Sequence, residues 1–81
     1  MFELTGFQRD LLYVISGLDA PTGQEVKREL ERTQERTIQE GQLYRNLDQL
    51  VDKGLVEKQT GSGRTNHYDN TDDGESVVEG L

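Results

Sequence analysis

The sequence predicts a mainly α-helical (α+β) fold in which three helices and a two-stranded β-hairpin are followed by a short fourth helix. Three observations predict it: repeated Thr-x-x-Gln or Thr-x-x-Glu capping boxes, apolar residues at helical spacing after them, and two strand-like segments around a glycine-rich tip. This order of elements is that of a winged helix-turn-helix domain. The length of 81 residues is enough for one such domain, so we expect it to span residues 1–81.

The first helix is expected over residues 6–18, where Thr5 and Gln8 form a capping box and the turn 19–21 closes the helix. A second box, Thr22 with Glu25, opens the next helix. That helix shows a charged face to water and buries Val26 and Leu30.

A third box over residues 37–40 is expected to open the third helix. Its apolar stripe has the spacing i, i+4, i+7, i+8 and consists of Leu43, Leu47, Leu50 and Val51. Gly54 fits the left-handed position just past a helix end, with Leu55 folding back as its apolar partner. The hairpin then pairs residues 56–60 with 66–69 around 61–63, and a short acidic helix runs from 71 to 81.

The net charge of −7 is unusual for a protein that binds nucleic acid. The acidic residues gather at the two ends of the chain: residues 1–35 carry −3, residues 69–81 carry −5, and residues 36–68 carry +1. Such a surface is typical of proteins adapted to molar salt, and we expect a halophile-like surface here. An ordinary acidic surface is the alternative.

Several function classes are excluded by composition. There is no cysteine, no ligand set with metal-binding spacing, no apolar run long enough for a membrane span and no signal peptide, so we expect a cytoplasmic protein. His67 is the single histidine, and no carboxylate lies beside a predicted pocket. We therefore expect no enzyme, no metal and no cofactor.

The polar side of the third helix carries residues suited to reading DNA. Gln42, Arg45 and Gln49 lie there, and these side-chain types pair bidentately with adenine and guanine edges in the major groove. The alternative is that they are ordinary solvated residues of a surface helix. The hairpin that follows favours DNA binding.

The segment Gly41-Gln-Leu-Tyr-Arg-Asn-Leu-Asp-Gln-Leu-Val-Asp-Lys-Gly-Leu-Val56 closely resembles the recognition helix of PadR-like transcriptional regulators. The resemblance continues through Gly61-Ser-Gly-Arg-Thr-Asn-His-Tyr68 and Thr71-Asp-Asp-Gly-Glu75, and it covers residues 11–81. It implies a homodimeric repressor or autoregulator that binds a near-palindromic operator in double-stranded DNA.

The resemblance also implies roles for two residues. Tyr44 would touch a phosphate beside the major groove, although it is equally suited to be a half-buried aromatic at the core edge. Arg64 at the wing tip would reach the backbone or the minor groove. The expected DNA-binding residues are Gln42, Tyr44, Arg45, Gln49, Lys58, Arg64, Asn66 and His67. Family wings are richer in arginine and lysine than this one.

A dimer interface is expected because some apolar residues lie outside the core of the first three helices. These residues are Phe2, Leu4, Val77, Val78 and Leu81. The main alternative to DNA binding is a winged-helix module that binds only protein. Asp48, Asp52 and the overall charge favour that alternative, whereas a positive face on the third helix and wing would favour DNA.

Overall fold

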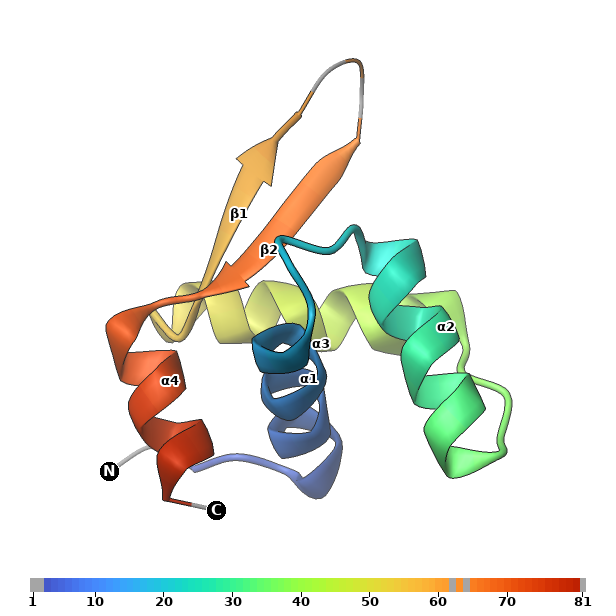
Figure 1. Ribbon diagram of the computed structural model, residues 1–81, viewed down its shortest axis with the longest axis horizontal. Helices are drawn as coiled ribbons and strands as arrows, with labels where there is room; N and C mark the ends of the chain where they lie inside the picture. The colour runs from blue at the N-terminus through green and yellow to red at the C-terminus, as the bar shows by residue number, and fades with distance from the viewer. Residues whose placement is uncertain (1–2, 62, 64, 81) are drawn as a thin grey trace.

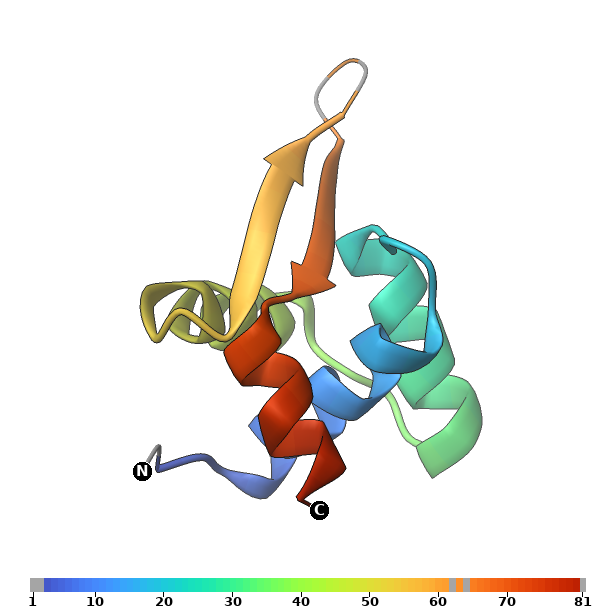
Figure 2. The same cartoon turned by 60° about the vertical axis from the view of Figure 1, so that its left-hand side comes forward.

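The computed structural model describes residues 3–61, 63 and 65–80, and shows a helical body from which a β-hairpin projects (Figure 1). The elements in chain order are α1 (Gly6–Gly17), α2 (Gly23–Gln34), α3 (Glu40–Asp52), β1 (Val56–Thr60), β2 (Asn66–Asn70) and α4 (Asp72–Glu79). Helix α4 packs beside α1, and its end lies on the side of the body opposite to the hairpin tip (Figure 2). The predicted winged helix-turn-helix order is therefore confirmed.

The first two capping boxes are confirmed. Thr5 Oγ1 accepts from the Gln8 amide at 3.1 Å, and Thr22 Oγ1 accepts from the Glu25 amide at 3.1 Å. In return, the Glu25 carboxylate accepts from the Thr22 amide at 2.9 Å. Both helices thus begin at the residue that follows the capping threonine.

The third predicted capping box is wrong. Helix α3 starts at Glu40, and its N-cap is Gln39, which makes no side-chain cap bond. The linker before it is held in another way: the Ile38 side chain is buried in the core, and its amide donates to Glu31 Oε2 at 2.8 Å. Because the core takes up Ile38 as part of the linker, the helix begins later than the box predicts.

The end of α3 has the predicted glycine turn. Gly54 has a φ of +75°, and its amide donates to the Val51 carbonyl at 3.0 Å. The Leu55 amide donates to the Leu50 carbonyl at 3.0 Å, which completes a Schellman motif. Leu55 is fully buried, so this turn directs the chain from α3 into the wing.

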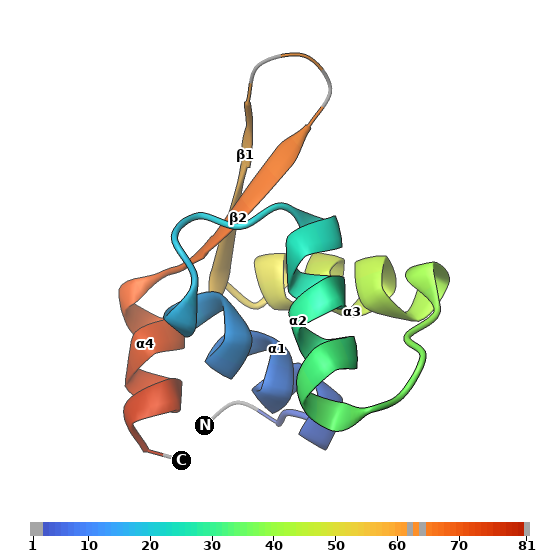
Figure 3. The ribbon, with the colours of Figure 1, turned by 45° about the vertical axis from the view of Figure 1, so that its right-hand side comes forward.

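The core lies between the three N-terminal helices and the base of the hairpin. Its buried apolar side chains, among the described residues, are Leu11, Leu12, Ile15, Val26, Leu30, Ile38, Leu43, Leu47, Leu50, Leu55, Val56 and Tyr68. The strands pair antiparallel, with Val56 opposite Asn70 and Lys58 opposite Tyr68. Figure 3 shows the hairpin rising beside the N-terminal end of α2, which brings these two elements to one side of α3.

Candidate nucleic-acid interface

The start of α2, one flank of α3 and the second wing strand meet at an open pocket of about 410 Å³, which we call the α2–wing pocket. Its lining residues are Thr22, Gly23, Gln24, Tyr44, Thr65, Asn66 and Tyr68. Backbone amides at a helix start favour anions, and hydroxyl and amide side chains bind phosphate oxygens. The chemistry of the pocket therefore suits a phosphodiester backbone.

Tyr44 is held in place at this pocket from two sides. Its hydroxyl accepts a hydrogen bond from Gln24 Nε2 at 3.1 Å. Its ring lies against Gly23, where an added Cβ would be 2.6 Å from Tyr44 Cε1. The side chain is partly buried against the core while its hydroxyl remains at the pocket. Both suggested roles of Tyr44, core-edge packing and phosphate contact, are compatible with this position.

Tyr68 joins the wing to the core. The side chain is 2 % exposed, and its amide donates to the Pro21 carbonyl at 2.8 Å. Burial, followed by the nearby Asp48 carboxylate and Tyr44, raises the pKa of Tyr68 above its usual value. The hydroxyl therefore stays protonated and is available as a donor at neutral pH.

His67, predicted to contact DNA, faces the turn between α1 and α2. Its Nδ1 lies 2.8 Å from the Ala20 carbonyl oxygen, and its backbone forms an isolated bridge with Thr22. The adjacent Asn66 lines the α2–wing pocket, and its Oδ1 accepts from Thr60 Oγ1 at 3.2 Å. The structure thus brings Asn66 to the pocket and uses His67 to attach the wing.

The three residues predicted to read bases do not share one environment. Arg45 is exposed, and no ion pair to it is present among residues 3–61, 63 and 65–80. Gln49 is also exposed, but its Oε1 accepts from Gln8 Nε2 of α1 at 2.7 Å. Gln42 is half-buried, and its backbone carbonyl accepts from Asn46 Nδ2 at 2.7 Å. Arg45 is therefore the freest of the three.

Two lysines near α3 are paired with carboxylates of that helix. Lys58 Nζ, on β1, lies 3.7 Å from Asp48 Oδ1. Lys27 Nζ, on α2, lies 3.8 Å from Glu40 Oε1, which also accepts from Gln24 at 3.1 Å. Lys27 and Gln24 were not predicted as site residues. Their position in the first turns of α2, directly after a capping box, is the signal that indicates them.

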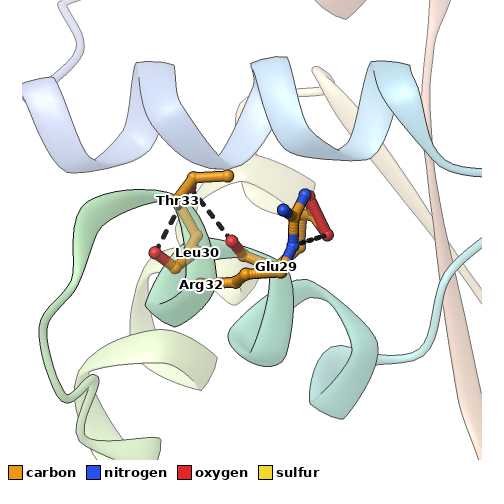
Figure 4. A network of polar contacts seen from close by, with 4 residues as sticks. All are labelled: Glu29, Leu30, Arg32 and Thr33. Carbon is orange, nitrogen blue, oxygen red and sulfur yellow. Dashed lines mark hydrogen bonds and ion pairs between the residues drawn. The ribbon is translucent and has the colours of Figure 1, made fainter.

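Farther along α2, one pair of opposite charges lies within the helix. Figure 4 shows the Arg32 guanidinium directed at the Glu29 carboxylate, and Thr33 Oγ1 donating to the backbone carbonyls of Glu29 and Leu30. The arginine lowers the pKa of Glu29 below its usual value. Arg32 is therefore paired within its own helix.

The expected dimer residues are only partly visible. Leu4, Val77 and Val78 are half-buried and pack against the core of their own chain, which differs from the expectation that they lie outside it. Phe2 and Leu81 lie outside the described residues, as does Arg64 of the wing tip.

Other kinds of site receive no support from the described part of the chain. Over residues 3–61, 63 and 65–80, no three histidine or acidic side chains are grouped so as to hold a metal ion. None of the helices there has the length and apolar character of a membrane span.

The chain is similar in sequence and structure to several solved structures. H. salinarum RosR is 44 % identical, with a TM-score of 0.90 over 96 % of this chain and 70 % of that chain. A mutant of E. coli MarR, in complex with operator DNA, is 28 % identical, with a TM-score of 0.82 over 96 % of this chain and 53 % of that one. Lactococcus lactis ZitR, a zinc-responsive MarR family member, is 16 % identical with a TM-score of 0.80 and shares the fold. No curated protein sequence matches the chain.

Residues 11–80 also match the transcriptional regulator PadR-like family. This match includes the α2–wing pocket, the whole of α3 and both wing strands. The chain therefore belongs to the PadR-like family of transcriptional regulators and has the winged-helix fold of RosR and MarR.

Proposed function

We propose that this regulator binds double-stranded DNA sequence-specifically, with α3 in the major groove and the wing on the backbone or minor groove. The observation that carries the proposal is the convergence of the α2 start, Tyr44 and the wing on one pocket, with the exposed Arg45 following Tyr44 on α3. An arginine on a helix in the major groove binds guanine O6 and N7, while the pocket holds a neighbouring phosphate. A mutant of E. coli MarR, which has this fold, forms a complex with operator DNA, and this supports DNA binding here.

We further propose that the protein acts as a homodimeric repressor or autoregulator on a near-palindromic operator. Two-fold symmetry would place the two α3 helices about 34 Å apart, one turn of DNA. Leu4, Val77 and Val78 pack against the core but are only partly buried, and they are the described candidates for the subunit contact. Sedimentation at high protein concentration and high salt tests this, and a strictly monomeric mass would refute it.

The experiment that tests DNA binding is selection of bound sequences from random duplexes, at low and at molar potassium chloride. Enrichment of one near-palindromic motif supports the proposal. The control is Arg32→Ala, because Arg32 is paired with Glu29 within α2 and lies away from the pocket. Arg45→Ala should change the selected motif, whereas the Arg32 variant should select the wild-type motif.

A protein-binding module is the second candidate, because α3 also exposes Glu40, Asp48 and Asp52. Two of these carboxylates are already paired with lysines, so the face is less negative than its sequence indicates. Absence of any enriched motif at every salt concentration would favour this candidate.

A further inference from the structure

Gln8 is the one polar side chain in the buried class among the described residues, with 2 % of its surface exposed. It lies in the first turn of α1 and reaches across to α3. Its Nε2 group donates to Asn46 Oδ1 at 3.0 Å and to Gln49 Oε1 at 2.7 Å. A buried amide whose hydrogens are both used in this way ties the two helices together at a defined point.

The orientation of this amide chain is fixed at both of its ends by backbone groups. At one end the Thr5 amide, which can only donate, faces Gln8 Oε1 at 3.4 Å. At the other end the Gln42 carbonyl, which can only accept, takes a hydrogen from Asn46 Nδ2. Asn46 must therefore present its oxygen to Gln8, and Gln8 must present its nitrogen to α3.

Gln49 then has one orientation left. Its Oε1 is directed inward to Gln8, so its Nε2 hydrogens face outward on the exposed surface of α3, one turn after Arg45. A free glutamine pairs with adenine by using one donor and one acceptor. A glutamine that shows only donors instead matches an edge with acceptors alone, and guanine N7 and O6 form such an edge in the major groove.

We propose that Gln8 is a positioning residue that fixes the amide orientation of Gln49, so that Gln49 presents donors to DNA and selects guanine over adenine or cytosine. The proposal rests on the DNA-binding function proposed above. It changes the expected role of Gln49 from an adenine reader to a donor-only reader, and it gives a recognition role to a residue that touches no DNA.

Two Gln8 variants test it by duplex selection with the full chain. Gln8→Glu keeps an acceptor for Thr5 but removes both donors, so Gln49 must turn its nitrogen inward and its oxygen outward. The preference at one operator position should then move from guanine to adenine or cytosine, which present an amino donor in the major groove. Gln8→Met leaves Gln49 free to rotate, and the same position should lose its preference by about tenfold. A purely structural Gln8 would weaken all sequences equally and leave the motif unchanged.

Gln49→Ala supplies the matched control. If Gln8 acts through Gln49, neither Gln8 variant alters the motif in the Gln49→Ala background. Replacing the preferred guanine by 7-deazaguanine should weaken wild-type binding about tenfold and leave the Gln49→Ala variant unaffected. If methylphosphonate at a flanking phosphate has that effect instead, Gln49 contacts the backbone and the base assignment is overturned.

The outcomes separate this inference from the function on which it rests. If wild type enriches no motif, the DNA-binding proposal itself fails. If wild type and both Gln8 variants enrich one and the same motif, the function stands and the inference is wrong.

Discussion

The Nζ of Lys58 on the first wing strand lies 3.7 Å from Oδ1 of Asp48 on helix α3. Both side chains are partly exposed, at 41 % and 62 %, so solvent and salt screen the pair and it contributes little to stability. Its importance lies in binding. Under the proposed function, Lys58 would leave Asp48 to bind a DNA phosphate, and Asp48 would then take up a cation from solution. That uptake would offset the cation that the phosphate releases.

Asp48→Asn should therefore steepen the salt dependence of DNA binding. The slope of log affinity against log salt should become more negative by about 0.9 per subunit, the value for one uncompensated phosphate contact. Titration of the selected operator from 50 mM to 1 M potassium chloride measures it. Asp52→Asn is the control. This substitution removes the same charge from α3, but no ion pair of Asp52 with a lysine is present among the described residues. Equal slopes in both variants would rule out the exchange at Lys58.

Specific binding by the wild-type protein should survive molar potassium chloride. The chain has nine basic residues and a net charge of −7, so few phosphate contacts are available and the acidic ends repel DNA when salt is low. A regulator with 6–10 phosphate contacts loses roughly 10³–10⁵ in affinity between 50 and 200 mM salt. Here the slope should be shallow or even positive. Loss of binding above a few hundred millimolar would show that the acidic surface is no salt adaptation.

Alanine substitutions of Arg45 and Arg64 should distinguish reading of DNA bases from sequence-independent contact with the DNA. Arg45→Ala should cost about 1–3 kcal/mol of binding and relax the preference at one base position. Arg64→Ala should weaken binding to all sequences alike, because a wing-tip arginine contacts the backbone or reads groove width. Selection followed by affinity measurement on matched and mismatched duplexes tests both. The reverse pattern would exchange their roles.

Gly74→Ala should destabilise the protein by about 1–3 kcal/mol, the usual cost of overpacking. A Cβ at this buried position in α4 would lie 2.1 Å from the Leu55 carbonyl oxygen, a backbone atom that cannot turn aside. Gly41→Ala is the matched control, since nothing lies within 4 Å of a Cβ there and alanine favours the helix. Urea unfolding should show a lower free energy of unfolding for Gly74→Ala and a higher one for Gly41→Ala than for wild type. An unchanged free energy of unfolding in Gly74→Ala would contradict the observed contact.

The capping box of α2 should give a contribution to stability that depends on pH. Hydrogen bonds from Thr22, above all from its backbone amide, lower the pKa of Glu25 below its ordinary value of 4.5. A lowered folded-state pKa stabilises the fold above 4.5, and this stabilisation is lost as the pH falls through the folded-state pKa. The melting temperature of Glu25→Gln should thus fall below that of wild type at pH 7 and converge with it under more acidic conditions. A constant difference across that range would exclude the linkage.

The order of elements was readable from the sequence because local signals determine it. Thr5, Thr22 and Gly54 each act on the backbone within a few residues, and their predicted roles are confirmed. The box at 37–40 failed because a tertiary demand, burial of Ile38, overrode the local one. Strand and helix ends differ from the predicted ends by one or two residues elsewhere.

The site was less predictable, because side-chain partners come from distant segments. Helical spacing placed Gln42, Arg45 and Gln49 on one polar side, but it contains no information on Gln8, which precedes Gln49 by 41 residues. His67 was assigned by its place on the wing, whereas its partner is the carbonyl of Ala20. No local pattern indicates such pairings.

The attachment of β2 to the α1–α2 turn has a mechanical consequence. The amide of Tyr68 and the ring of His67 hold two successive carbonyls, those of Pro21 and Ala20, directly before α2 begins. These two hydrogen bonds join the base of the wing to the start of α2, so we expect the two elements to move together as a rigid unit. Under the proposed function, the protein would set the spacing between the backbone contacts of the wing and of α2, and the DNA would bend to match it. Operators whose steps deform easily will fit at the lowest energetic cost, even at base pairs that no side chain touches.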